Sequence, residues 1–257
     1  MVARSIVVTG ASSGLGAALA RAYAAPGVIL GLVGRNPERL TAVASACRAA
    51  GATVDEALID VAERAHREAW LISLDHRNPV DLVIANAGIS AGPPAGSASE
   101  DADLTTRQIA VNLLGAVNTV APLLPAMAGR GKGQIALIAS LAAYRGLPYS
   151  PGYCASKAGL RAYGEALRAL AEPHGIGVTV VCPGFFTSPM TDRWDGPTPF
   201  VISGDRATRK IKRAIDRSRR RVSFPWPMVL GMRVCDTLPS ALGDRILRGF
   251  RFQIRSA

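Results

Sequence analysis

The segment Thr9-Gly10-Ala11-Ser12-Ser13-Gly14-Leu15-Gly16 decides the fold, because it joins a strand-like run at 5–9 to a helical pattern that begins near Gly14. Gly10 permits a tight turn, Gly14 lets the main chain approach a pyrophosphate, and Gly16 allows close packing of helix on strand. The helix N-terminus adds free N–H groups and a positive dipole end. By itself the spacing G-x-x-x-G-x-G leaves open a turn that needs glycine only for its geometry.

Short aliphatic runs alternate with helical patterns outward from this turn. We expect strands at 5–9, 28–33, 53–59, 81–85, 134–139 and 177–182, and helices that begin near residues 14, 37, 61, 103 and 152. Such alternation predicts a parallel sheet with right-handed crossovers and helices on both faces. Residues 1–257 should therefore form a single doubly wound α/β domain of about seven strands, with a helix at 205–217 and a strand at 221–224 near its end.

Composition limits the class of protein. The chain has 257 residues, 49% apolar and 19% charged, which is typical of a domain with a large core. Its four cysteines lie far apart without a CxxC pair, so we expect no disulfide scaffold, no structural zinc and a reducing compartment. No leader-like segment opens the chain, and no run approaches ~18 uninterrupted apolar residues, so secretion and membrane spanning are not expected.

Six features, the glycine turn among them, occur in chain order and resemble the short-chain dehydrogenase/reductase family. They are the TGxxxGxG turn at 9–16, Asn86-Ala87-Gly88, Asn112, Ser140, the pair Tyr153 and Lys157, and Pro183-Gly184. The resemblance covers residues 5 to about 190 and implies a Rossmann fold that binds a nicotinamide dinucleotide. One departure is Ala85, where many members have a second asparagine.

The residues of this constellation suit proton transfer to or from an oxygen. Tyr153 and Lys157 are four apart on a helical pattern and share one face, where an ammonium would lower the pKa of the phenol. Ser140 ends a strand and can hold a carbonyl oxygen against Tyr153. The resemblance gives Asn112 a water in a proton relay. We therefore predict that the catalytic residues are Asn112, Ser140, Tyr153 and Lys157.

The end of the second strand predicts the cofactor. It reads Gly34-Arg35-Asn36, which lacks the acid that would bind a ribose 2′-hydroxyl and offers a guanidinium for a 2′-phosphate. NADP(H) is the prediction. The cofactor-binding residues expected from the turn, from Arg35 and from the resemblance are Gly10, Ser12, Ser13, Gly14, Leu15, Gly16, Arg35, Asp60, Val61, Asn86, Ala87, Gly88, Tyr153, Lys157, Pro183, Gly184 and Thr187.

The substrate is expected to be a hydrophobic ketone or secondary alcohol. The loops at 90–98 and 185–199 follow strand ends, where ligands bind in such sheets. The apolar side chains expected around the substrate are Leu141, Tyr144, Phe185, Phe186, Met190 and Trp194. His66, His76 and His174 have no metal-ligand spacing, so no metal is predicted. A non-catalytic NADP-binding regulator remains the alternative function.

The C-terminal part carries the excess charge. Residues 1–200 hold 16 Lys/Arg and 15 Asp/Glu, whereas residues 201–257 hold 14 and 4. The segment at 205–217 can be a pocket-covering helix with a solvated outer face. Alternatively, the basic residues at 206–221 form a patch for anionic lipid or an acidic carrier, together with Trp226, Met228, Leu238, Leu242, Ile246, Leu247 and Phe250.

The expected partners are a small carbonyl or alcohol substrate and further copies of the chain. The resemblance implies a homo-dimer or tetramer, and we expect a cytoplasmic location, with peripheral membrane contact through the basic segment as an open alternative. Nucleic acid is not an expected partner, because no stacking aromatic array or reader motif accompanies the basic residues.

Overall fold

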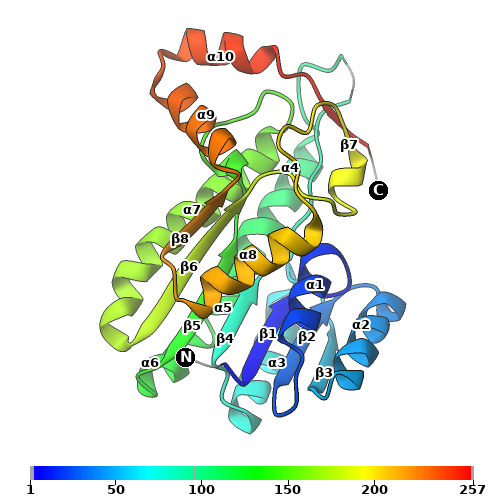
Figure 1. Ribbon diagram of the computed structural model, residues 1–257, viewed down its shortest axis with the longest axis vertical. Coiled ribbons are helices and arrows are strands. Elements are labelled where there is room, and N and C mark those ends of the chain that lie inside the picture. Colours follow the sequence, from blue (N-terminus) through cyan, green and yellow to red (C-terminus); the bar gives the residue numbers. More distant parts are fainter. Residues whose placement is uncertain (1–2, 95, 256–257) are drawn as a thin grey trace.

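Seven parallel strands form the central sheet of the computed structural model, which describes residues 3–94 and 96–255 (Figure 1). The order across the sheet is β3-β2-β1-β4-β5-β6-β8, so the predicted doubly wound fold of seven strands is confirmed. The strands are β1 (Ser5–Thr9), β2 (Ile29–Gly34), β3 (Thr53–Leu58), β4 (Leu82–Ala85), β5 (Gly133–Ile138), β6 (Ile176–Pro183) and β8 (Arg221–Phe224). Residues 1–2, where the sequence predicts no leader segment, lie outside the described residues. Residue 95, in the loop predicted at 90–98, also lies outside them.

Helices cover both faces of the sheet. On one face α1 (Gly14–Tyr23), α2 (Pro37–Ala49) and α8 (Gly204–Asp216) bury side chains such as Leu19 and Ile211 against the strands. On the other face lie α3 (Arg64–Arg77), α4 (Ala102–Ile109), α5 (Gly115–Val120), α6 (Leu124–Gly129) and α7 (Pro151–Ala171). Because these strands pair in parallel, the carboxyl ends of β1, β4, β5 and β6 lie together along one side of the sheet.

One helical run on the second face, residues 102–129, is apolar enough in composition to span a membrane, with a mean hydropathy of 1.6 over its best window. Its inner side is part of the protein core, since Val120, Leu123 and Met127 are buried among sheet residues. The run is therefore a core helix of the fold. A single π-helical turn, Ala110–Leu114, interrupts it and contains Asn112.

The third helix begins at Arg64, three residues later than the expected start near residue 61. The delay has a local cause. The Asp60 carboxylate accepts a hydrogen bond from the Ala62 amide (2.9 Å), and the Asp60 carbonyl accepts one from the Glu63 amide (2.9 Å). These bonds form a turn that competes with the first helical turn.

The basic helix α8 packs on the protein body, but it does not cover the pocket as expected. Ala207, Ile211 and Ile215 are fully buried beside α1, and the charged side chains of the helix face outward. Two of its cations have intramolecular partners: Lys212 pairs with Asp216, and Lys210 lies 5.4 Å from the Phe224 ring centroid. The helix therefore closes one face of the sheet.

Residues 226–254 contain structure that the sequence patterns did not reveal. Two helices, α9 (Trp226–Thr237) and α10 (Ser240–Arg248), form a hairpin beyond the carboxyl end of the sheet (Figure 1). The chain then returns to pair β9 (Gln253–Ile254) antiparallel with β7 (Trp194–Asp195). This arrangement divides the predicted basic and apolar patch, because the arginines at 217–220 precede β8 and the apolar helix α9 follows it.

Candidate active site

The glycine turn joins β1 to α1 against the end of β4. Gly10 and Gly14 have φ of +65° and +53°, a region that favours glycine. The Asn86 side chain donates to the carbonyl oxygen of Thr9 (3.0 Å), and the Thr9 hydroxyl accepts from the amides of Asn86 and Ala87 (3.0 and 3.1 Å). The turn is thus held by the segment that follows β4.

The two glycines of the first helical turn have different surroundings. A Cβ on Gly16 would lie 2.2 Å from the carbonyl oxygen of Gly10, so this glycine is required for packing. A Cβ on Gly14 would meet only Pro189, at 3.8 Å, and would otherwise enter open space. The first turn of α1 contains no acidic side chain, and its N-cap Ser13 makes no side-chain cap hydrogen bond. Its N–H groups are available for an anionic ligand.

Two arginines lie at the end of the cavity beyond the carboxyl end of β2. Arg35 and Arg39 both line it, and Asn36 between them caps α2 by accepting from the Arg39 amide (2.8 Å). Arg39 did not stand out in the sequence, and its place one turn into the helix is the signal that could have found it. Both cations are solvent-exposed and open toward the cavity.

Asp60 is the acidic partner of the arginines in this region. It forms ion pairs with Arg107 and, at 3.6 Å, with Arg35. Burial tends to raise the pKa of Asp60, but hydrogen bonds from the Ala62 amide and Arg107 and the positive charges of Arg107 and Arg35 hold this pKa below its ordinary value. The carboxylate is therefore charged at neutral pH and keeps Arg35 near the cavity.

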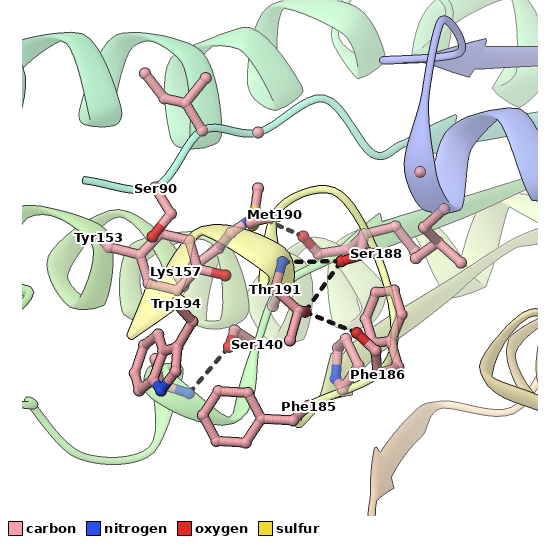
Figure 2. Close-up of a pocket in the computed structure, with 18 of the residues that line it drawn as sticks. Ser90, Ser140, Tyr153, Lys157, Phe185, Phe186, Ser188, Met190, Thr191 and Trp194 are labelled. Carbon is pink, nitrogen blue, oxygen red and sulfur yellow. Dashed lines mark hydrogen bonds between the residues drawn. The ribbon is translucent and has the colours of Figure 1, made fainter. Parts of the chain in front are cut away.

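Tyr153 and Ser140 face the middle of the cavity from α7 and from the end of β5 (Figure 2). Burial raises the pKa of Tyr153 to about 12, and a hydrogen bond with Ser140 acts in the opposite direction. The Ser140 hydroxyl also accepts from the Ala142 amide (3.2 Å), which fixes its rotamer. The phenol is therefore protonated at neutral pH in the protein alone and can donate to an oxygen held beside it.

Lys157 reaches the same centre from one turn further along α7. It is 4% exposed, its ammonium donates to the carbonyl oxygen of Ile138 (2.9 Å), and it lies 5.8 Å from the Tyr153 ring centroid. Burial lowers the pKa of Lys157 to about 8. The predicted pairing of the two side chains is thus present in space, with the lysine anchored to β5.

Asn112 lies behind this centre in the π-helical turn and is fully buried. Its amide donates to the carbonyl oxygen of Ile89 and to the Ser156 hydroxyl (both 2.9 Å), and its oxygen accepts from the Ile89 amide (2.7 Å). Asn112 does not line the cavity. It positions the segment after β4 against α7, and its role in a water relay stays a prediction.

A cavity of about 790 Å³ joins the glycine turn, the Arg35 region and the Tyr153 centre. Most of the predicted residues line it: Gly10, Ser12, Ser13, Gly14, Leu15, Arg35, Asp60, Val61, Asn86, Ala87, Gly88, Ser140, Tyr153, Lys157, Pro183 and Gly184. Thr187 lies outside the lining, where its hydroxyl accepts from the Gly204 amide (2.8 Å) and fixes the start of α8. Ser188 and Thr191 stand at the cavity in its place.

The other half of the cavity is apolar. Of the predicted substrate residues, Leu141, Phe185, Phe186, Met190 and Trp194 line it. Figure 2 shows the last four. Tyr144 does not, because it is buried between two arginines and its hydroxyl bonds to Ser223 (2.8 Å). Met228, Met232, Leu247 and Phe250 from the C-terminal hairpin complete the wall.

Aromatic stacking closes this half from one side. Trp194 stacks on Phe252 with ring centroids 3.8 Å apart, and Phe185 meets Trp194 edge-on at 4.8 Å. Arg193 adds a hydrogen bond to the carbonyl oxygen of Ser90 (2.8 Å), joining both substrate loops. Sequence reasoning missed Phe252 and Arg193, because their partners are 58 and 103 residues away.

The cavity fits a dinucleotide by its donors and by its shape. The positive-φ turn leaves room for a phosphate beside free helix N–H groups, and two arginines stand at one end. Nothing comparable exists for a metal within residues 3–94 and 96–255, where no group of three His, Cys, Asp or Glu side chains could hold one.

Comparisons with known proteins agree with this geometry. The sequence model of the short chain dehydrogenases matches residues 4–197. An uncharacterised oxidoreductase of Myxococcus xanthus is 35% identical over 96% of this chain and 98% of its own. A granaticin polyketide synthase putative ketoacyl reductase of Streptomyces violaceoruber is 37% identical over 73% of this chain and 69% of its own. A short-chain dehydrogenase from Sphingobium yanoikuyae, solved in complex with NADPH, gives a TM-score of 0.77 at 26% identity over 92% of this chain and 97% of that one.

Proposed function

This chain belongs to the short-chain dehydrogenase family, and we propose that it is an NADP(H)-dependent oxidoreductase that interconverts a hydrophobic ketone and a secondary alcohol. The observation that carries the proposal is the meeting of Ser140, Tyr153 and Lys157 in one cavity, between a phosphate-binding turn and an apolar wall. A non-catalytic regulator finds no support in this arrangement, since Ser140, Tyr153 and Lys157 all line the cavity and Asn112 supports its walls from behind.

The chain's own groups supply binding and proton transfer. Ser140 donates a hydrogen bond to the substrate oxygen, and Tyr153 gives that oxygen its proton in the direction of reduction. Lys157 places a positive charge beneath the site, where it favours the phenolate that remains. The nicotinamide, when bound, supplies or accepts the hydride. Asn112 holds the segment at 86–89 against α7 and so fixes the positions of these two walls of the site.

Preference for NADP(H) is supported by Arg35 and Arg39, which line the cavity beyond β2 where no acid is present. The relative from Sphingobium yanoikuyae contains NADPH, which agrees with this preference. Asp60 is itself neutralised by Arg107 and Arg35, so it does not repel a phosphate as a free carboxylate would.

A hydrophobic substrate is supported by the apolar wall, to which β5, the loop after β6 and the C-terminal hairpin contribute. The resemblance to a putative ketoacyl reductase is compatible with a ketone on an aliphatic chain. Assembly as a homo-dimer or tetramer and a cytoplasmic location stay predictions.

The proposal is tested by titrating the protein with NADPH and NADH and then measuring NADPH oxidation with a series of aliphatic and aromatic ketones. We expect NADPH to bind at least about tenfold more tightly and hydrophobic ketones to be reduced, with no turnover by Tyr153→Phe. Tight NADPH binding without turnover across the series would favour the regulator, and tighter binding of NADH would refute the cofactor assignment.

A further inference from the structure

The hairpin α9–α10 lines the apolar half of the cavity and projects from the body of the protein (Figure 1). The inner side of the hairpin packs on the body of the protein. Met228, Val229 and Met232 lie against the core between the sheet and α7, and Leu247 is 7% exposed. An ion pair between Arg145 and Asp244 (2.7 Å) fixes α10 to the segment after β5. The hairpin is therefore a fixed part of the cavity wall.

The outer side of the hairpin is also apolar. On α9, Trp226, Leu230 and Val234 are spaced four residues apart and are 73%, 54% and 49% exposed. On α10, Leu242 and Ile246 repeat the spacing and are about half exposed. Five large apolar side chains exposed on two neighbouring helices exceed the scattered apolar residues of an ordinary surface and indicate a binding surface.

The exposed apolar side chains are accompanied by positive charge. Arg245, Arg248 and Arg251 are exposed on or just after α10. The acids of this region are Asp236 and Asp244, and Asp244 is already paired with Arg145. A second copy of the hairpin would bring like charges together, whereas anionic headgroups would complement the arginines while apolar side chains enter the acyl boundary.

The apolar surface continues from the outside into the cavity. Ile246 is 49% exposed and also lines the cavity, together with Gly231, Leu247 and Phe250. A molecule dissolved in lipid could pass along this surface to the catalytic half without crossing water. The hairpin thus connects a lipid-compatible exterior to an apolar interior.

We propose that the α9–α10 hairpin docks the protein on the surface of an anionic lipid bilayer, with the mouth of the substrate cavity facing the lipid. Trp226, Leu230, Val234, Leu242 and Ile246 enter the interface, and the nearby arginines contact the headgroups. Docking does not depend on the reaction proposed above, since it uses the outer side of the hairpin.

The test is co-sedimentation of the full chain with vesicles of phosphatidylcholine alone and of phosphatidylcholine mixed with phosphatidylglycerol. We expect binding to the anionic vesicles at low salt, and a several-fold decrease in high salt because the arginine contacts are screened. NADPH binding in the same samples reports that the protein is folded. Absence of binding to anionic vesicles by protein that still binds NADPH overturns the proposal.

Two pairs of variants locate the surface. Arg245→Glu with Arg248→Glu should weaken vesicle binding at least ~10-fold, whereas Arg217→Glu with Arg219→Glu, the same change in net charge before β8, should have little effect. Leu230→Glu should weaken binding, and Leu170→Glu should not, although Leu170 is 71% exposed at the far end of α7.

The variants also separate the proposal from its rivals. Equal losses in both charge pairs would mean general attraction to net positive charge and would overturn a docking role for the hairpin. A stable dimer that Leu230→Glu dissociates would overturn it as well, because a second copy would then cover this surface. NADPH binding should stay within about twofold of wild type in all four variants, which separates a loss of docking from a loss of the proposed enzyme function.

Discussion

The ammonium of Lys157 donates a hydrogen bond to the main-chain carbonyl oxygen of Ile138, 2.9 Å away, and so joins α7 to the last residue of β5. Ser140 follows Ile138 by two residues, and Tyr153 precedes Lys157 by one helical turn. The bond therefore fixes the distance between the two walls that carry the hydroxyl groups of the site.

Tyr153→Phe should abolish carbonyl reduction and leave NADPH binding within about threefold, because the ring and its packing persist and only the proton donor is lost. Steady-state turnover together with a fluorescence titration of NADPH measures both effects. Turnover near the wild-type rate would remove Tyr153 from the mechanism.

Ser140→Ala should lower the turnover number about 100-fold and move the pH profile of alcohol oxidation to higher pH. Oxidation needs Tyr153 as phenolate, so its rate rises with pH. Hydrogen bonding with Ser140 lowers the pKa of Tyr153 against the effect of burial, and its loss raises that pKa further. A pH profile unchanged in position would show that Ser140 only binds the substrate.

Lys157→Met should stabilise the protein while it weakens turnover and NADPH binding. Burial lowers the pKa of Lys157 to about 8, so the charged lysine destabilises the folded state below that pH. Its removal should add about 1–2 kcal/mol to the free energy of unfolding at pH 7, after the loss of the bond to Ile138 is subtracted.

The stability gain of Lys157→Met has a defined pH dependence. Wild-type stability rises as pH increases from about 8 toward the ordinary lysine value of 10.5, because the unfolded chain there binds more protons than the folded one. The advantage of the variant should therefore be constant below about pH 8 and shrink above it. Thermal unfolding across this range checks the sign, and an advantage that grows with pH contradicts it.

Arg35→Ala should lose ~2 kcal/mol of NADPH binding, about 30-fold in Kd, and leave NADH nearly unaffected, because only NADPH carries a 2′-phosphate for the guanidinium. Arg48→Ala is a matched control. Arg48 lies on α2, the helix that follows Arg35, and pairs with Glu56 on β3 away from the cavity. Equal loss for both cofactors would make Arg35 a structural residue.

Gly16→Ala and Gly14→Ala should fail in different ways. A methyl group on Gly16 would lie 2.2 Å from the Gly10 carbonyl oxygen, so the variant should lose ~3 kcal/mol or more of stability. A methyl group on Gly14 would enter open space at a positive φ of 53°, so we expect ~1–2 kcal/mol of strain and a larger loss of NADPH binding. Thermal unfolding and cofactor titration of each variant distinguish packing from binding.

The sequence alone was enough to predict the sheet, the glycine turn and the side chains proposed for catalysis. The strand and helix patterns are local, since alternation, turn glycines and a four-residue spacing are readable within a single segment. The pairs Tyr153 with Lys157 and Gly10 with Gly16 needed no distant partner to be found. Local turn chemistry still moved the start of α3, because the Asp60 side chain bonds to the Ala62 amide.

Only the tertiary structure decided which residues close the cavity and which merely support it. Arg193 bonds to Ser90 across 103 positions, Trp194 stacks on Phe252 across 58, and Thr187 turns away to Gly204. The structure also separated the arginines at 217–220 from the apolar hairpin, since β8 lies between them. Such contacts depend on how loops and terminal segments pack over the ends of the sheet, and the periodicity of a sequence carries no information about neighbours brought together by folding.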